Sequence, residues 1–278
     1  MEYYIVDAFT DKPFGGNPAG VVLLDGEQFP KEELMQQVAA ELRYSETAFV
    51  LRHSANNYTL RYFTPCHEVE LCGHATIATF FVLYREGLAH GSCQCHTLAG
   101  NLNVVADRSV MMQMATPGII DTIDHPEDIY HAVGLTGYNP TLPVQTVRSG
   151  LIDIMLPLPD VATLQALQPD MNAIAALTKQ IGAVSIHPFA TTHDGYTAHV
   201  RDFAPIYGVP EESATGTANA ALTHYLQQHG IITPTGHFSF LQGEAMGRPS
   251  VVATQLAPDG SLYVGGTAAI VAHGQLLP

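Results

Sequence analysis

Basic residues are scarce in this chain. Its 278 residues include 11 Lys and Arg against 26 Asp and Glu, which gives a formal net charge of -15. Such a charge repels phosphate backbones and anionic membranes at long range, so neither nucleic acid nor a membrane is an expected partner. A small anionic metabolite is still acceptable, because a helix start can locally outweigh the mean field of the surface.

Long apolar runs and secretion signals are also missing. No apolar run reaches the length that crosses a membrane. Residues Met1 to Asp7 contain no basic segment followed by an apolar core, so we expect no signal peptide. The chain is large enough not to need disulfides. A reducing cytoplasm therefore fits its few cysteines, which are Cys66, Cys72, Cys93 and Cys95.

No nucleotide-binding fingerprint is present. The glycine-containing loop Asn17-Pro18-Ala19-Gly20 leads into an expected strand at Val21 to Leu24, but its letters match neither a P-loop nor a dinucleotide-binding motif. We therefore predict no cofactor.

The stretch Tyr62 to Ala78 reads as a strand, a tight turn and the start of a helix. Pro65 breaks the extended run, and Gly73 immediately precedes a helical pattern of apolar residues. A helix start carries unpaired N–H groups and a partial positive charge, so it favours a carboxylate. Gly73 would let that ligand approach the backbone closely.

This pattern recurs once. Arg61-x-Phe63-x-Pro65 is echoed by Arg201-x-Phe203-x-Pro205, and an alanine-rich helix follows each copy. The second helix begins near Gly216, after Glu211 and Glu212. The echo predicts a duplicated lobe, with two helix starts facing one shared cleft.

Strands are expected mostly in hairpin-like pairs with occasional helices. This arrangement favours an α+β fold with mixed or antiparallel sheets over a doubly wound parallel one. The breakers Thr116-Pro117-Gly118 mark the expected crossover, with a first lobe over 1–117 and a second beginning at 118. The closing alternation from Leu262 to Val271 is expected to be a strand.

Two carboxylate positions are candidates for chemistry. Glu46 precedes the apolar strand Ala48 to Leu51, where partial removal from water would suit it to general acid and base work. The alternative is a solvated glutamate at a strand end. Glu212 lies just before the second helix, where it either caps that helix or acts as a charge partner, while the N–H groups of Gly216 and Thr217 bind substrate.

Motifs along nearly the whole chain resemble the phenazine-biosynthesis PhzF-like isomerase family. They are YIVDAFTDKPFGGNPAGVVL at the N-terminus, SETAFV, YFTP...EV.LCGHAT, RDFAP...GV.E..ATG.A and QGEAMGRPS. The resemblance implies a diaminopimelate-epimerase-like fold. In that fold two similar lobes each wrap a closed or nearly closed sheet around a central helix, with the active site between them.

The resemblance also implies roles for single residues. Glu46 matches the family's general acid and base, and His74 matches its motif histidine. Glu212 stands where the family pattern EDPATGSA has aspartate, Thr217 stands at its serine and Ser213 replaces its proline. The extra methylene of Glu212 would displace its charge by about one bond length. The last strand is expected to return to the first lobe, so that lobe comprises 1–117 and 265–278 and the other comprises 118–264; the family also forms homodimers.

The residue patterns and the family resemblance support the same hypothesis. Glu46 would take a proton from a carbon beside an unsaturated system and return it elsewhere on the same face, without a cofactor. The starts at Gly73-His74 and Gly216-Thr217 would hold the substrate carboxylate. His74 and Glu212 would tune Glu46 or bind polar substituents, and Asn17 could line the pocket.

Three alternatives remain open. One is a metal site built from Cys66, His67, Cys72 and His74, although their spacing matches no recognised motif, so we predict no metal. The second is a cysteine-dependent racemase, but Thr215 stands where related epimerases have their second cysteine, and its hydroxyl is a poor base. The third is a catalytically idle small-ligand binder.

Overall fold

The computed structural model describes residues 1–138 and 140–277, and the chain divides into two compact units. The first unit is Met1–Gln113 with Gly265–Pro278, and the second is Met114–Val264. The sequence placed the crossover at Thr116 to Gly118, and the units separate between Gln113 and Met114. Pro278, the last residue of the expected first lobe, lies outside the described residues.

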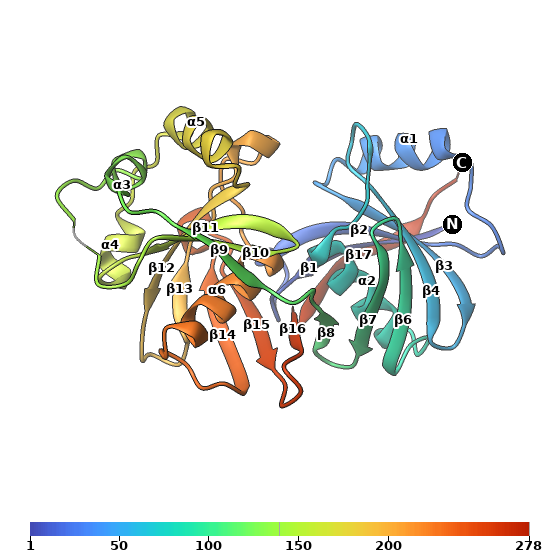
Figure 1. The fold of residues 1–278 in the computed structure, drawn as a ribbon. Coiled ribbons are helices and arrows are strands. Elements are labelled where there is room, and N and C mark those ends of the chain that lie inside the picture. Colours follow the sequence, from blue (N-terminus) through green and yellow to red (C-terminus); the bar gives the residue numbers. More distant parts are fainter. Residues whose placement is uncertain (139, 278) are drawn as a thin grey trace. The chain divides into compact units, whose positions relative to one another are not determined.

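The first unit is a mixed sheet around one helix (Figure 1). Its strand order is β17–β1–β2–β3–β4–β6–β7–β8. Only the pairs β2–β3 and β4–β6 in this series are parallel. The element bounds are β1 Glu2–Ala8, β2 Asn17–Leu23, α1 Glu32–Leu42, β3 Thr47–Ser54, β4 Asn57–Phe63, β5 Glu68–Val69, α2 Gly73–Arg85, β6 Gly91–Thr97, β7 Gly100–Ala106, β8 Val110–Gln113 and β17 Ala268–Gln275.

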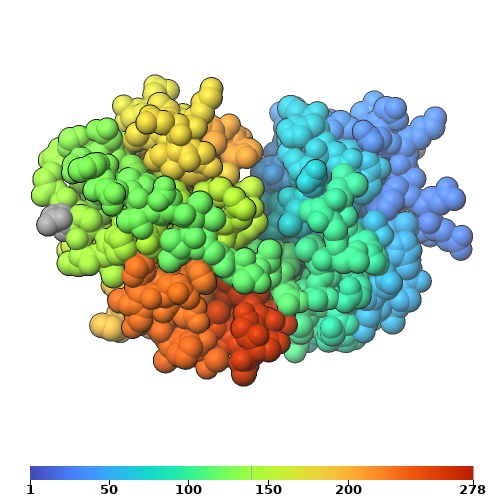
Figure 2. Space-filling model, viewed as in Figure 1, coloured from blue at the N-terminus to red at the C-terminus, as the bar shows by residue number. Residues whose placement is uncertain are grey.

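The second unit repeats this arrangement. Its strands pair in the order β9–β10–β11–β12–β13–β14–β15, and the parallel pairs are β11–β12 and β13–β14. Helices α3 and α5 lie at its surface, in green and yellow in Figure 2. The bounds are β9 Gly118–Thr122, α3 Glu127–Ala132, β10 Gln145–Ser149, β11 Leu151–Pro157, α4 Val161–Gln165, α5 Met171–Ile181, β12 Ser185–Thr191, β13 Ala198–Val200, α6 Gly216–Gln228, β14 Gly236–Gln242, β15 Ser250–Leu256 and β16 Leu262–Gly266.

The two series match pair by pair. Starting from β17 and from β9, both run antiparallel, antiparallel, parallel, antiparallel, parallel, antiparallel. The second parallel crossover carries α2 in one unit and α6 in the other. The predicted α+β class, with two similar lobes that each wrap a sheet around a central helix, is therefore confirmed.

The central helices are buried on all sides, which explains their unusual composition. Every residue of α2 from His74 to Leu83 is buried, and the helix contacts six strands of its own unit. In α6 the run Ala218 to Thr223 is buried against β9, β10, β11 and β15. A helix enclosed in this way must be apolar or small around its whole circumference, not along one stripe. Among the described residues no helix is both long and apolar enough to cross a membrane.

Several sequence expectations need correction. The final alternation forms two strands, β16 and β17, and β17 pairs with β1. Sequence periodicity missed β9, α3, β14 and β15, and the two-residue strand β5.

The Arg-x-Phe echo marks equivalent structures. Arg61 bonds Glu68 through Nε and Nη2, and its guanidinium carbon lies 5.2 Å from the ring centroid of Phe63. Arg201 bonds Glu211 in the same two-pronged way, at 2.8 Å for each contact, and lies 4.9 Å from the ring of Phe203. Each pair ties the end of a strand to the loop that leads toward the central helix.

We expect the two arginines to differ in their contribution to stability. Arg201 is 8% exposed and also reaches the carbonyls of Leu164 and Leu167, whereas Arg61 is 21% exposed. Arg201→Met should cost about 3 to 5 kcal/mol, because it removes a buried cation that binds both the Glu211 carboxylate and the carbonyls of Leu164 and Leu167. Arg61→Met should cost about 1 kcal/mol. Urea unfolding of both variants measures this, and equal losses would contradict the assignment.

Candidate functional site

The start of α2 receives no cap from the side chain of its N-cap residue. Cys72 is the N-cap residue, in an extended conformation, and its side chain makes no capping hydrogen bond. By contrast, Asp160 and Asp170 cap α4 and α5. A β-carbon added at Gly73 would meet only the Met112 methyl, at 3.9 Å, so the space before this residue is open. The helix start can therefore accept an anion.

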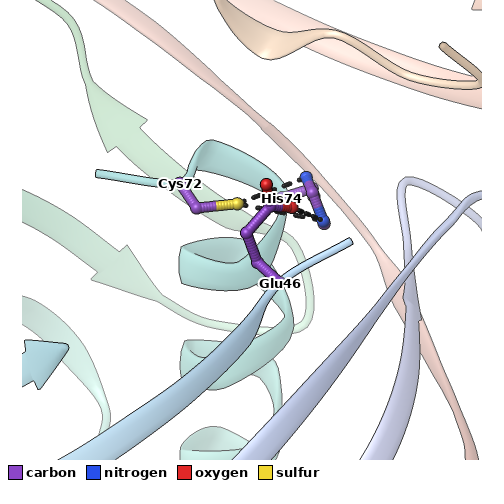
Figure 3. A group of neighbouring side chains, drawn as sticks. All are labelled: Glu46, Cys72 and His74. Carbon is purple, nitrogen blue, oxygen red and sulfur yellow. Dashed lines mark hydrogen bonds and ion pairs between the residues drawn. The ribbon is translucent and has the colours of Figure 1, made fainter. Parts of the chain in front are cut away.

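Glu46 and His74 come together at this start. Glu46 lies just before β3, and its backbone carbonyl accepts a hydrogen bond from Gly20 on the parallel neighbour β2. Its Oε2 lies 3.2 Å from Nε2 of His74, the second residue of α2 (Figure 3). The contact lacks hydrogen-bond alignment, and within the described residues this buried oxygen has no hydrogen-bond partner. Such an orphan acceptor is costly unless a ligand completes it.

His74 has a protonation state set mainly by burial. Burial lowers the pKa of His74, and the attraction of Glu46 opposes that shift. Nε2 also lies 3.3 Å from the hydroxyl of Ser45. If Nε2 of a neutral His74 ring accepts a hydrogen bond from Ser45, it carries no proton to donate to Glu46. This agrees with the absence of a hydrogen-bond partner for Oε2 of Glu46 within the described residues.

Cys72 completes the group. Its buried thiol lies 3.4 Å from Nδ1 of His74, and ligand atoms of Glu46, Cys72 and His74 all lie within 4.8 Å of one another. These three could hold one divalent ion. The set differs from the one considered in the sequence: Cys66 is exposed, and Thr64 Oγ1 lies 3.3 Å from the imidazole of His67.

Asn17 begins β2 and is buried, opposite Ala8 of β1. It belongs to the same unit as Glu46, Gly73 and His74. Glu212, Gly216 and Thr217 belong to the second unit, around the start of α6.

The start of α6 is built differently. Thr215 is its N-cap residue, and the Thr215 side chain makes no capping hydrogen bond. The Glu212 carboxylate contacts the Thr215 hydroxyl at 2.5 Å. Glu211 is engaged by Arg201. Gly216 and Thr217 are half-buried first residues of α6.

Two residues that the sequence did not single out, Gln242 and Asp202, form hydrogen bonds at the start of α6. Gln242 accepts from the Thr215 N–H and donates to the Glu212 carbonyl and the Thr215 hydroxyl. Asp202 accepts from the Thr215 hydroxyl at 2.9 Å. Both residues lie in motifs noted in the sequence, RDFAP and QGEAMGRPS, but nothing in their spacing indicated that they meet at one helix start.

Comparisons with known proteins agree with this architecture. The family model described as "Phenazine biosynthesis-like protein" matches residues 6–274. The uncharacterized isomerase YddE of Escherichia coli is 33% identical, covering 99% of this chain and 97% of that protein. The trans-2,3-dihydro-3-hydroxyanthranilate isomerase of Pseudomonas aeruginosa is 31% identical over 98% of each chain.

A solved structure gives the same result. The crystal structure of a Bacillus anthracis phenazine biosynthesis protein of the PhzF family has a TM-score of 0.88 at 28% identity, covering 100% of this chain and 99% of that one. With isomerases as full-length relatives and one helix enclosed in each unit, this chain belongs to the phenazine biosynthesis-like PhzF family and is an isomerase.

Proposed function

We propose that this isomerase shifts a proton within a small unsaturated carboxylate, with Glu46 as general acid and base. The observation that carries the proposal is the buried Oε2 of Glu46, which has no hydrogen-bond partner within the described residues and lies beside an uncapped helix start. A base must reach a carbon-bound proton with an oxygen that is not already committed, and this oxygen meets that condition.

The substrate carboxylate would lie at the start of α2. The N–H groups of Gly73 and His74 point along the helix axis, and the partial positive charge there offsets the negative charge of the ligand. Glu46 would then take a proton from a carbon next to the unsaturated system and return it to another carbon on the same face, so that the double bond moves. Neutral His74 would lie beside the Glu46 carboxylate, with Nε2 3.2 Å from Oε2, without donating a proton to it, so that Oε2 stays available to the substrate.

The chemistry of a relative is compatible with this substrate class. The Pseudomonas aeruginosa protein is named for a dihydroaromatic amino carboxylate, trans-2,3-dihydro-3-hydroxyanthranilate. Gly216 and Thr217 at the start of α6 are proposed as further substrate-binding residues, with Glu212 beside them. The four cysteines are free thiols, which suits a reducing cytoplasm.

Replacing Glu46 tests the base. Unsaturated cyclic and amino-acid carboxylates are incubated with the enzyme in deuterated water and read by mass increase. Glu46→Gln should lower deuterium incorporation by at least about 100-fold, because the amide cannot accept the proton. Glu41→Gln, at an exposed position in α1, is the matched control and should keep the wild-type rate. Retained exchange in a folded Glu46→Gln variant would refute the assignment.

Gly73 tests the anion site. A methyl group at this position enters open space, so Gly73→Ala should fold, and it should weaken binding of the substrate carboxylate by about tenfold by blocking approach to the N–H groups. Calorimetric titration with an active carboxylate measures the effect. Gly26→Ala adds a methyl in an exposed loop and should bind normally. Unchanged affinity in Gly73→Ala would move the carboxylate elsewhere.

His74 tests the electrostatics. Because burial lowers the pKa of His74, the unfolded chain binds protons near pH 6.5 before the folded one does, and stability falls as the pH drops below that value. The wild type should therefore lose more stability than His74→Asn between neutral pH and about pH 5, by at most about 1.4 kcal/mol per pH unit. His125→Asn, at an exposed position, should behave like the wild type. Equal slopes for wild type and His74→Asn would show that the ring is not buried neutral.

A further inference from the structure

Thr215 joins two carboxyl groups in the second unit. Its Oγ1 lies 2.9 Å from Oδ2 of Asp202 and 2.5 Å from Oε2 of Glu212. A hydroxyl carries one proton, so it can donate to only one of these oxygens. The amide Nε2 of Gln242 lies 3.1 Å from the same Oγ1 and can only donate to it. If both carboxyl contacts are hydrogen bonds, one of the two carboxyl groups must supply a proton.

The hydroxyl of Ser185 also lies between two carboxyl groups, those of Asp202 and Asp153. Its Oγ lies 2.7 Å from Oδ1 of Asp202 and 2.9 Å from Oδ1 of Asp153. Again one hydroxyl proton faces two carboxyl groups. Asp153 and Asp202 are 2% and 1% exposed, so carrying a charge on both would be very unfavourable.

The surroundings favour one anion among the buried pair. Burial and the nearby charge of Asp202 raise the pKa of Asp153 to about 8, so Asp153 is the protonated partner at Ser185. His187 lies with Nδ1 3.0 Å from Oδ1 of Asp202, and its own Nε2 is buried with no hydrogen-bond partner within the described residues. Arg201, the neighbouring cation in the chain, is engaged by Glu211.

We propose that Asp202 and Glu212 share one proton through the hydroxyl of Thr215, and that this pair is the proton store of the α6 start. In one state Asp202 holds the proton and Glu212 is ionised. In the other, the Asp202 proton has moved to Thr215 while the Thr215 proton has moved to Glu212. The negative charge then lies on Asp202, where Ser185, His187 and Thr215 stabilise it, and no proton is gained or lost.

The store lets Glu212 become neutral when an anionic substrate binds; this inference rests on the proposed function. An ionised Glu212 beside Gly216 and Thr217 would repel an anionic substrate. A Glu212 that draws a proton from Asp202 is neutral, with its one O–H held by Thr215, so it would no longer repel that substrate. Asp202 and Thr215 are positioning residues in this scheme, since neither needs to touch the substrate.

The test is the infrared spectrum of the free enzyme at neutral pH, where protonated carboxyl groups absorb apart from ionised ones. The wild type should show a protonated carboxyl that disappears in Glu212→Gln and also in Asp202→Asn, since in each the Thr215 hydroxyl then serves the remaining carboxylate. Thr215→Val should lose it too, whereas Thr215→Ser should keep it. Asp153→Asn should remove a different band and leave this one.

The two Thr215 variants also separate a proton role from a structural one. With an active carboxylate, Thr215→Val should shift the pH profile of kcat relative to Thr215→Ser, which restores the hydroxyl. A protonated band that survives in both Glu212→Gln and Asp202→Asn would overturn the shared proton, as would identical pH profiles for the Thr215 variants. Because the infrared measurement uses no substrate, an error in the proposed substrate class would leave its outcome unchanged.

Discussion

A helix enclosed by a curved sheet must begin inside the fold, and its first N–H groups must then be satisfied there. The remaining features of both candidate sites follow from this constraint. The N-cap residues of α2 and α6 do not cap their helices with their side chains, whereas aspartates at the N-cap positions of α4 and α5 do. An uncapped start within a packed unit is a place where an anion can replace the missing cap.

The two similar units each contain one such helix start, and different side chains surround the two starts. At α2 a thiol, a neutral imidazole and a carboxylate meet, and the carboxylate has an oxygen without a hydrogen-bond partner. At α6 the thiol position is Thr215, whose hydroxyl bridges Asp202 and Glu212. The Thr215 hydroxyl is a poorer base than a thiol, but it contacts both acids.

The sequence predicted those parts of the fold that depend on local pattern. The Arg-x-Phe-x-Pro echo predicted the duplication, and the structure explains it by matched Arg–Glu pairs stacked on Phe63 and Phe203. The sequence could not predict that Asp202 and Gln242 are partners of Thr215, because folding brings these residues together from distant parts of the chain. The sequence also could not predict that Glu211 pairs with Arg201 while Glu212 contacts Thr215, because two adjacent glutamates look alike in sequence.

The central claim is that an anion replaces the cap of α2 while Glu46 meets the reacting carbon. A crystal structure with a bound unsaturated carboxylate tests it most directly. The account predicts the ligand carboxylate at the N–H groups of Gly73 and His74, with one carbon about 3 to 3.5 Å from an oxygen of Glu46. A ligand bound with its carboxylate away from this helix start, or with Glu46 turned from every carbon, would contradict it.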